Sequence, residues 1–234
     1  MKSFWLVFMA LSAPAWAADV VIDAVVVGPQ SIVGTSITWT HTCASNAVLY
    51  VALENNSPGT TLVSANGNTM TLVASIAGGQ HLSVYQMAGC SGSQTIQAFE
   101  AFGFLSGTSV SLLNAIAQPN GQTVDGAGTS IPAGTTYAPS VTSTINRCLP
   151  LLFLNESFGQ GSIFSPGSGT VMIVTGTPSA QQTPEIAAGS AVTTVAGTST
   201  LHVTSNATQN VWSIMIAVAP SGGFVANQSV FSIQ

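Results

Sequence analysis

Apolar and polar positions alternate along most of this chain with the period of a β-strand. Between residues 36 and 42, Ile37, Trp39 and His41 alternate with serine and threonine. Residues 48–53 (VLYVAL) form a continuous apolar run, which is typical of a strand covered on both faces. No segment sustains the 3.6-residue period of an amphipathic helix. The pattern therefore predicts an all-β protein.

Short apolar runs separated by turn residues define the predicted strands. The clearest signal is Asn66-Gly67 between the runs 62–65 and 70–73, because both residues tolerate the positive φ of a tight hairpin turn. Further strands are predicted at residues 20–27, 36–42, 48–53, 81–87, 95–102, 110–116, 140–145, 149–154, 169–175, 191–195, 198–203 and 211–217. Many short strands with this punctuation favour an antiparallel two-sheet sandwich, jelly-roll-like, that forms a single domain over residues 18–219.

Two segments stand apart from this strand pattern. Residues 118–138 are rich in turn-forming residues, and we expect them to form a long surface crossover. Residues 220–234 contain Gly222-Gly223 and then apolar Phe224, Val230 and Phe231. This tail is expected to be an extra edge strand, a linker, or a strand donated to a neighbouring molecule.

The first seventeen residues have the organisation of a secretory signal peptide. Lys2 supplies the positive charge, residues 4–11 (FWLVFMAL) are apolar, and Ala15-Trp16-Ala17 offers small residues at a cleavage site. A membrane anchor is the alternative, but the apolar run is far shorter than the roughly 20 residues that span a bilayer. We expect cleavage after Ala17. The mature protein is then expected to be secreted, or to lie on the surface of a cell or a virion.

The composition excludes several classes of function. Charged residues make up 4% of the chain and hydrophobic residues 46%. Arg147 is the only strong base after residue 17, so binding to nucleic acid is excluded, because it requires clustered Lys and Arg. Electrostatic attachment to membranes is excluded for the same reason. A surface with so little charge offers little repulsion between copies, which favours self-association.

A weak internal echo links two parts of the chain. Residues 40–43 (THTC) precede the strand 48–53 and then Glu54-Asn55, and residues 144–148 (TINRC) precede the strand 149–154 and then Asn155-Glu156. Two stacked halves of a sandwich would give this echo, and so would chance.

The three cysteines fit an oxidising compartment, with one disulfide and one remaining thiol. Cys43 and Cys148 each precede a buried strand, so adjacency of those strands would pair them. Cys43–Cys148 is the pairing we favour, and Cys43–Cys90 and Cys90–Cys148 remain open.

The segments SITWTHTC (36–43), NAVLYVAL (46–53), ANGNTMTLV (65–73) and HLSVYQMAG (81–89) together resemble a known domain. It is a β-sandwich domain of unknown function that occurs in secreted bacterial proteins and in tailed-phage structural proteins. Residues 146–154 and 211–219 are similar to its later strands. The resemblance implies a β-sandwich over most of the mature chain and brings no catalytic residues with it.

Residues that carry metal or nucleophile chemistry form no recognisable motif. His41, His81 and His202 lie in alternating strands without metal-ligand spacing, so a zinc site is not expected. The G-x-S-x-G nucleophile motif of a serine hydrolase is also lacking.

Among the acidic residues, Glu54 and Glu156 are the strongest candidates for a catalytic pair. They end the two echoed strands, and glycoside hydrolysis needs two carboxyl groups about 5–10 Å apart. The alternatives are acids kept for solubility, or part of a Ca²⁺ site with loop carbonyls. Apart from this calcium alternative we expect no cofactor.

Four aromatic residues fall in predicted loops or turns: Tyr137, Phe158, Phe164 and Phe224. Exposed rings stack on sugar faces, so these residues are the candidate contacts for a glycan.

The sequence therefore predicts a non-enzymatic, exported structural or surface-assembly protein that associates with itself. A carbohydrate-binding or adhesive module is the alternative. A jelly-roll glycoside hydrolase or lyase is the more remote one.

Overall fold

The computed structural model of the chain describes residues 18–31, 36–55, 62–76, 81–100, 103–156, 164–175, 183–193 and 195–222, and for residues 118–127 and 129 it describes the backbone alone. All the strand pairs in this part are antiparallel. The all-β prediction is therefore confirmed.

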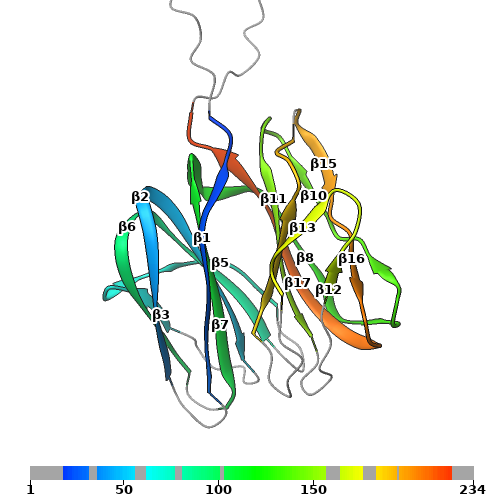
Figure 1. Cartoon of the computed structure of the whole chain (residues 1–234), viewed down its shortest axis with the longest axis horizontal. Helices are drawn as coiled ribbons and strands as arrows, with labels where there is room; N and C mark the ends of the chain where they lie inside the picture. The colour runs from blue at the N-terminus through cyan, green and yellow to red at the C-terminus, as the bar shows by residue number, and fades with distance from the viewer. Residues whose placement is uncertain are drawn as a thin grey trace, which may run out of the picture.

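The strands divide into an N-terminal half and a C-terminal half, which lie side by side (Figure 1). The N-terminal half contains β1 Val21–Ser31, β2 Ser36–Asn55, β3 Leu62–Ala65, β4 Asn68–Thr69, β5 Thr71–Ile76, β6 His81–Phe99 and β7 Leu105–Leu113. The C-terminal half contains β8 Ala115–Ile131, β9 Thr136–Tyr137, β10 Ser140–Ser143, β11 Leu149–Glu156, β12 Phe164–Pro166, β13 Thr170–Val174, β14 Glu185–Gly189, β15 Gly197–Thr200, β16 Val203–Ser205 and β17 Gln209–Pro220.

The two halves repeat one pairing scheme. In the N-terminal half the strands pair in the order β5-β6-β2-β7-β1, and in the C-terminal half in the order β13-β14-β11-β17-β8. Outside these inner strands, residues 36–43 of β2 pair with residues 92–99 of β6, and β10 pairs with β15. The echo between the two parts of the sequence thus corresponds to two halves with the same arrangement of strands.

A central core joins the two halves face to face. Apolar side chains from the inner strands of both halves form one buried cluster. Tyr50 of β2 and Phe153 of β11 meet in it with ring centroids 6.3 Å apart. Burial of apolar area is the main favourable term in folding, so this core holds the sandwich together.

Each half also closes over an outer core. In the N-terminal half β2 bends between Cys43 and Leu49, where its register with β6 shifts and Asn46 has a φ of 62°. The two arms of β2 therefore face each other, and Ile37 packs with Leu53 in the outer core. In the C-terminal half β9, β10, β12, β15 and β16 cover the outer face of β11 and β17. The sandwich predicted from the sequence is thus present, with an additional layer on each side.

Glycines let the outer arm of β2 lie close to β1 and β7. A Cβ atom on Gly107 would lie 2.7 Å from the indole of Trp39, and one on Gly28 would lie 2.8 Å from the carbonyl oxygen of Gly107. A side chain at either position would push the outer layer away, which explains glycine within β7.

One predicted loop is a strand. Residues 118–138 were expected to form a surface crossover, but β8 spans Ala115–Ile131 and pairs with β17 from Gln209 to Pro220. Pro119 and the turn-forming residues misled the prediction, because proline is tolerated in an edge strand and β8 is the edge of its sheet.

The described ends of the chain lie at the same end of the sandwich (Figure 1). Val21 of β1 pairs with Leu113, and Pro220 of β17 pairs with Ala115. Asn114, between these two partners, donates its side-chain amide to the carbonyl of Asp19 and accepts a hydrogen bond from the backbone of Ser221. Residues 1–17 and 223–234 lie outside the described residues.

Candidate functional site

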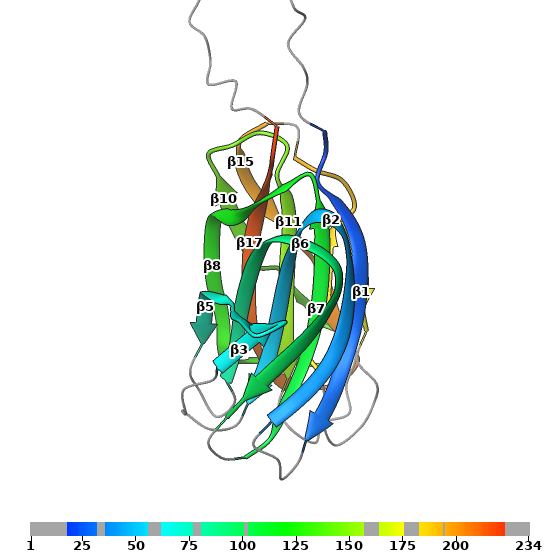
Figure 2. The same cartoon turned by 90° about the vertical axis from the view of Figure 1, so that its left-hand side faces the viewer.

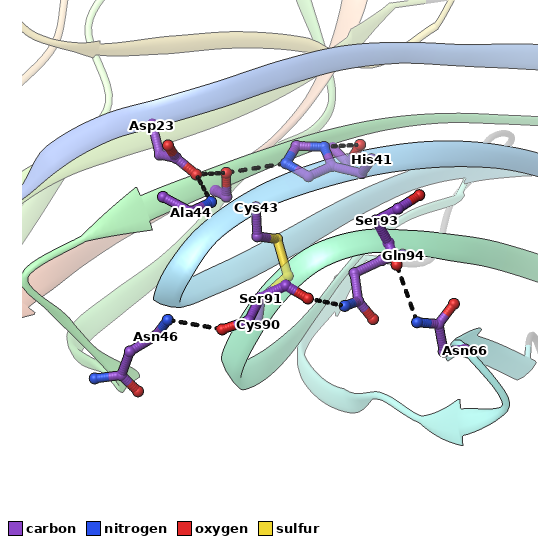
Figure 3. Close-up of a disulfide and its surroundings, with 12 residues drawn as sticks. Asp23, His41, Cys43, Ala44, Asn46, Asn66, Cys90, Ser91, Ser93 and Gln94 are labelled. Carbon is purple, nitrogen blue, oxygen red and sulfur yellow. Dashed lines mark hydrogen bonds between the residues drawn. A yellow bond between two sulfur atoms is a disulfide. The ribbon is translucent and has the colours of Figure 1, made fainter.

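A chain of hydrogen bonds runs through the N-terminal outer core around His41 (Figure 3). The hydroxyl of Ser111 donates to Asp23 Oδ2 at 2.8 Å, so it accepts from Nε2–H of His41 at 3.0 Å. The other ring nitrogen, Nδ1, lies 2.9 Å from the hydroxyl of Ser109, which also lies 3.4 Å from the carbonyl oxygen of Val26. That hydroxyl in turn accepts from the indole N–H of Trp39 at 3.0 Å. Both ring nitrogens of His41 are therefore hydrogen-bonded to serine hydroxyls.

This network contains the residue types of a serine hydrolase but lacks the access that catalysis needs. His41, Ser109 and Ser111 are fully buried. Asp23 bonds Ser111 and the backbone N–H of Ala44, so no hydrogen bond orients the imidazole through a carboxylate as in a catalytic triad. Burial lowers the pKa of His41 below its usual 6.5, and the carboxylate of Asp23 opposes this with a smaller effect. The network therefore stabilises the fold.

We expect His41→Ala to lower the free energy of unfolding by about 2–4 kcal/mol, because it leaves a cavity and removes the bonds to two buried hydroxyls. Urea denaturation at pH 7.5 measures this loss. The stability that neutral His41 supplies is present above pH 6.5 and decreases as the pH falls below it. His202→Ala is the matched control, since His202 is half-exposed, and we expect a change within about 0.5 kcal/mol. Equal effects of the two variants would contradict this role.

The disulfide joins Cys43 to Cys90, with Cα atoms 5.8 Å apart. It lies where β2 and β6 bend (Figure 3), beside a hydrogen bond from the backbone N–H of Asn46 to Ser91 Oγ. The favoured pairing Cys43–Cys148 is wrong, because each half closes on its own outer core. Cys43 and Cys90 are buried in the N-terminal outer core and Cys148 in the C-terminal one.

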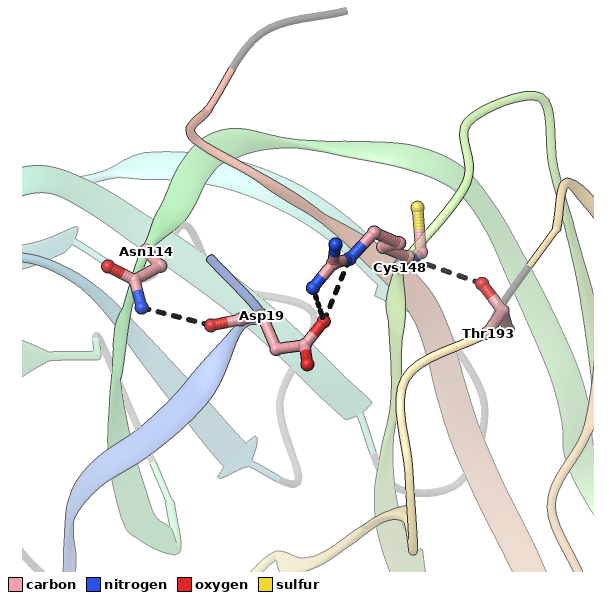
Figure 4. Close-up of polar contacts among 5 residues, drawn as sticks. Asp19, Asn114, Cys148 and Thr193 are labelled. Carbon is pink, nitrogen blue, oxygen red and sulfur yellow. Dashed lines mark hydrogen bonds and ion pairs between the residues drawn. The ribbon is translucent and has the colours of Figure 1, made fainter. Parts of the chain in front are cut away.

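Cys148 is a free, buried thiol. Its sulfur lies 3.1 Å from Ser143 Oγ, and its backbone N–H donates to Thr193 Oγ1 (Figure 4). These contacts are those of a packed structural cysteine, not of an exposed reactive one.

Glu54 lies between the two inner sheets. It is 1% exposed and accepts a hydrogen bond from the Ser106 hydroxyl at 3.4 Å. Burial raises its pKa to about 8, and the smaller effects of the Asn155 side chain and of Ser106 favour the ionised form. At neutral pH Glu54 is therefore mainly a neutral carboxylic acid, which touches the C-terminal half through Asn155.

Glu156 points to the other face of its sheet. Side chains of β11 alternate, with Leu151 and Phe153 in the central core and Leu152 and Leu154 in the outer core. Asn155 thus faces Glu54, and Glu156 faces the outer core. Both acids end strands of the sandwich, but the structure does not aim them at a shared space. Within the described residues no three His, Cys, Asp or Glu side chains form a group that could hold a metal ion.

The candidate glycan contacts have different surroundings from those expected. Tyr137 is half-buried against the C-terminal outer core, and its hydroxyl lies 2.6 Å from Ser213 Oγ. Phe164 is 2% exposed. Phe158 and Phe224 lie outside the described residues. Of the two described rings, Phe164 is thus buried and Tyr137 is partly so.

The charged side chains that the structure describes are ion-paired, hydrogen-bonded or buried; that of Asp125 is not among them. Arg147 forms an ion pair with Asp19 at 2.7 Å (Figure 4), and Asp23 bonds inward as above. The glutamates of the chain are all buried: Glu54, Glu100, Glu156 and Glu185. The sequence left open that Glu54 and Glu156 are kept for solubility, and their burial was not predicted.

The outer layer presents hydroxyl groups in place of charges. Ser36, Thr38, Thr40 and Thr42 of β2 are exposed. In the C-terminal half, Ser140 lies 3.1 Å from Thr200 and Thr142 lies 2.9 Å from Thr198, oxygen to oxygen. Because these hydroxyl groups can hydrogen-bond to one another, the outer layer is polar without being charged.

β1 is an edge strand of the N-terminal sheet, and β4 and β5 lie at the opposite edge (Figure 2). It pairs with β7 on one side, and Val21 and Val27 are 50% and 53% exposed. An open edge with apolar side chains is a template for another strand. We therefore regard this edge as the candidate functional surface of the protein.

Comparison with protein-family models, with curated proteins and with solved structures finds no match to this chain. The resemblance to the β-sandwich domain of secreted bacterial and tailed-phage proteins therefore stays a prediction. In the described part of the chain no helix is long and apolar enough to cross a membrane.

Proposed function

We propose that this chain is an exported, non-enzymatic structural protein that assembles with copies of itself on a cell, filament or virion surface. The observation that carries the proposal is the surface formed by the described side chains, where the charged groups are ion-paired, hydrogen-bonded or buried and an apolar strand edge is open. Repulsion between like-charged molecules normally keeps proteins apart, and here it is nearly lacking.

Export is supported by the signal-like residues 1–17 and by the buried disulfide, which fits an oxidising compartment. We propose that the mature protein begins at Ala18. N-terminal sequencing of the secreted protein would give ADVVIDA if this is correct, and a sequence starting with Met1 would contradict it.

The experiment for assembly uses the mature chain purified from an oxidising compartment. Light scattering coupled to size exclusion, over a range of concentrations from about 1 μM to 1 mM, is expected to show mass increasing with concentration. Because the contacts are uncharged, association should persist at 1 M NaCl, where the Debye length is about 3 Å and surface ion pairs are screened. Monomers at every concentration and pH would exclude the proposed function.

A further inference from the structure

The two halves of the sandwich are separate units of backbone pairing. In the described part of the chain, every strand pair joins two strands of the same half: β1 to β7 form one sheet, and β8 to β17 form the others. The Cys43–Cys90 disulfide also lies within the N-terminal half. Each outer core is built from residues of one half. A half can therefore leave its partner half without losing a strand pair, the disulfide or its own outer core.

The central core is the main contact between the two halves. Its buried apolar side chains come from both inner sheets, as in obligate dimers, whose interfaces resemble a domain core cut in half. Two polar contacts add to it, the ion pair of Arg147 with Asp19 and the contact of Glu54 with Asn155. The inner face of each half is thus an apolar surface that fits the opposite half.

The acid and the amide in this core favour the pairing of unlike halves. Glu54 belongs to the N-terminal half and is 1% exposed, and Asn155 belongs to the C-terminal half and is 2% exposed. If two N-terminal halves packed together, two Glu54 carboxyl groups would meet in a dry site, where two acids resist ionisation and repel each other. An N-terminal half therefore favours a C-terminal half, whether from its own chain or from a second copy.

A single residue, Asn114, connects the two halves. β7 ends at Leu113 and β8 begins at Ala115. Two peptide steps span at most about 7.6 Å, whereas packed sheets lie about 10 Å apart, so this connection has no spare length. Asn114 also has a φ of 55°, in the left-handed region that is strained for residues with a side chain. Short hinges under strain favour the exchange of segments between copies.

Two hydrogen bonds oppose this strain and hold the hinge closed. The side-chain amide of Asn114 donates to the carbonyl of Asp19 at 3.0 Å (Figure 4). The carbonyl of Asn114 accepts from the backbone N–H of Ser221 at 2.7 Å. An extended hinge loses both bonds and is relieved of the positive φ. Because the central core is the same in the closed and exchanged forms, the hinge and the protein concentration decide between them.

We propose that copies of this chain associate by exchanging halves, so that the N-terminal half of one copy packs on the C-terminal half of another, with Asn114 as the hinge. This inference rests on the proposed self-association and names a means for it that leaves the β1 edge free. Reciprocal exchange gives a closed dimer, and exchange passed from copy to copy gives an open filament.

Two hinge variants test the proposal, because both remove the Asn114 amide and differ in their tolerance of a positive φ. Valine strongly disfavours it, whereas glycine adopts it freely. Each mature chain is unfolded in urea with its disulfide intact and refolded over the concentration range given above, and its mass is measured by light scattering. We expect the association constant of Asn114→Val to exceed that of Asn114→Gly at least about tenfold. Equal constants would overturn the proposal.

The rate of dissociation distinguishes exchanged halves from a contact between outer surfaces. Reversing an exchange exposes the central core, so associated species should keep their mass for hours after dilution. Two tagged forms of the native chain should form mixed species when they are refolded together, and not when they are mixed after folding. Mixed species that form as soon as the folded chains meet would contradict half exchange.

Lengthening the hinge separates this inference from the proposed function. With Gly-Ser-Gly inserted after Asn114, each chain can close on itself without strain, so this variant should stay monomeric where the native chain associates. The same insertion after Gly67, in the turn between β3 and β4, is the matched control and should associate as the native chain does. If the hinge insertion leaves association unchanged, the halves are not exchanged, and self-association through another surface stands. If the native chain stays monomeric even after refolding at the highest concentration, both the inference and the proposed function fail.

Discussion

Replacing Glu54 with glutamine is expected to remove a loss of stability that the native protein suffers as the pH rises from 4.5 to about 8. The pKa of Glu54 is raised from 4.5 to about 8 by burial. In the unfolded chain the carboxyl ionises near pH 4.5, whereas in the folded chain it keeps its proton to about pH 8. The folded state thus binds more protons in this window, so stability is highest below pH 4.5 and decreases up to pH 8.

The expected size of this effect is large. One pKa unit corresponds to about 1.4 kcal/mol, so the difference in pH dependence between the native protein and Glu54→Gln should be roughly 2–5 kcal/mol. The amide of glutamine has the shape of the protonated acid and can still contact Ser106 and Asn155. At pH 9 the variant should therefore be the more stable protein, and at pH 4 the two should be similar.

Urea denaturation of both proteins from pH 4 to pH 9 measures this difference. Asp19→Asn is the matched control, because it also removes one acid, but one whose side chain is 49% exposed. The control should follow the native profile within about 1 kcal/mol, as for an exposed ion pair. If Glu54→Gln also runs parallel to the native profile, Glu54 does not stay protonated between the sheets.

Removing the Cys43–Cys90 disulfide is expected to lower the free energy of unfolding by about 4 kcal/mol. The bond closes a loop with a sequence separation of 47 residues, and the loop-entropy model gives about this value for such a length. For a domain of this size the midpoint of thermal unfolding should fall by roughly 8–15 °C. Calorimetry of Cys43→Ala/Cys90→Ala against the native protein measures the change.

Two comparisons show whether the loss of stability comes from the missing disulfide. Adding a reductant should lower the midpoint of the native protein toward that of the double variant and should leave the double variant unchanged. Cys148→Ala removes a buried thiol that is not bonded to another cysteine, so its midpoint should fall less, and the reductant should lower it further because the Cys43–Cys90 disulfide is intact. A double variant with the native midpoint would show that the bend of β2 and β6 needs no cross-link.

Local patterns in the sequence predicted local structure well. Asn66 and Gly67 have φ angles of 48° and 79°, as a tight hairpin turn requires, and Ala65 pairs with Asn68 across it. The apolar run 48–53 is a strand covered on both faces, because the central core lies on one side and an outer core on the other. These features depend on neighbouring residues, which the sequence shows directly.

Features that depend on distant residues were less predictable. β14 spans Glu185–Gly189, whereas the sequence placed a strand at 191–195, since Glu185 opens a run that does not read as a buried strand. Its burial depends on packing against β11 and β13. The disulfide was mispredicted for a related reason. The echo aligned Cys43 with Cys148 in equivalent places of two halves, and equivalent positions in two separate outer cores are not neighbours.

The candidate site shows the same division. The sequence predicted an uncharged surface, because the composition is known without the fold. It also predicted a role in association for strand edges or the tail. It did not predict that β1 is an edge strand or that the described chain ends beside it. Strand order and the contacts of Asn114 decide both, and they appear only in the folded chain.

The repeated halves differ at one place where identity would be costly. The central strand of the N-terminal half ends with Glu54-Asn55, and that of the C-terminal half ends with Asn155-Glu156. With the same order in both halves, two carboxyl groups or two amides would face each other between the two inner sheets. Two carboxyl groups in one dry site resist ionisation and repel each other. The reversed order places one acid opposite one amide instead. This single difference between two otherwise similar halves avoids the repulsion between two acids.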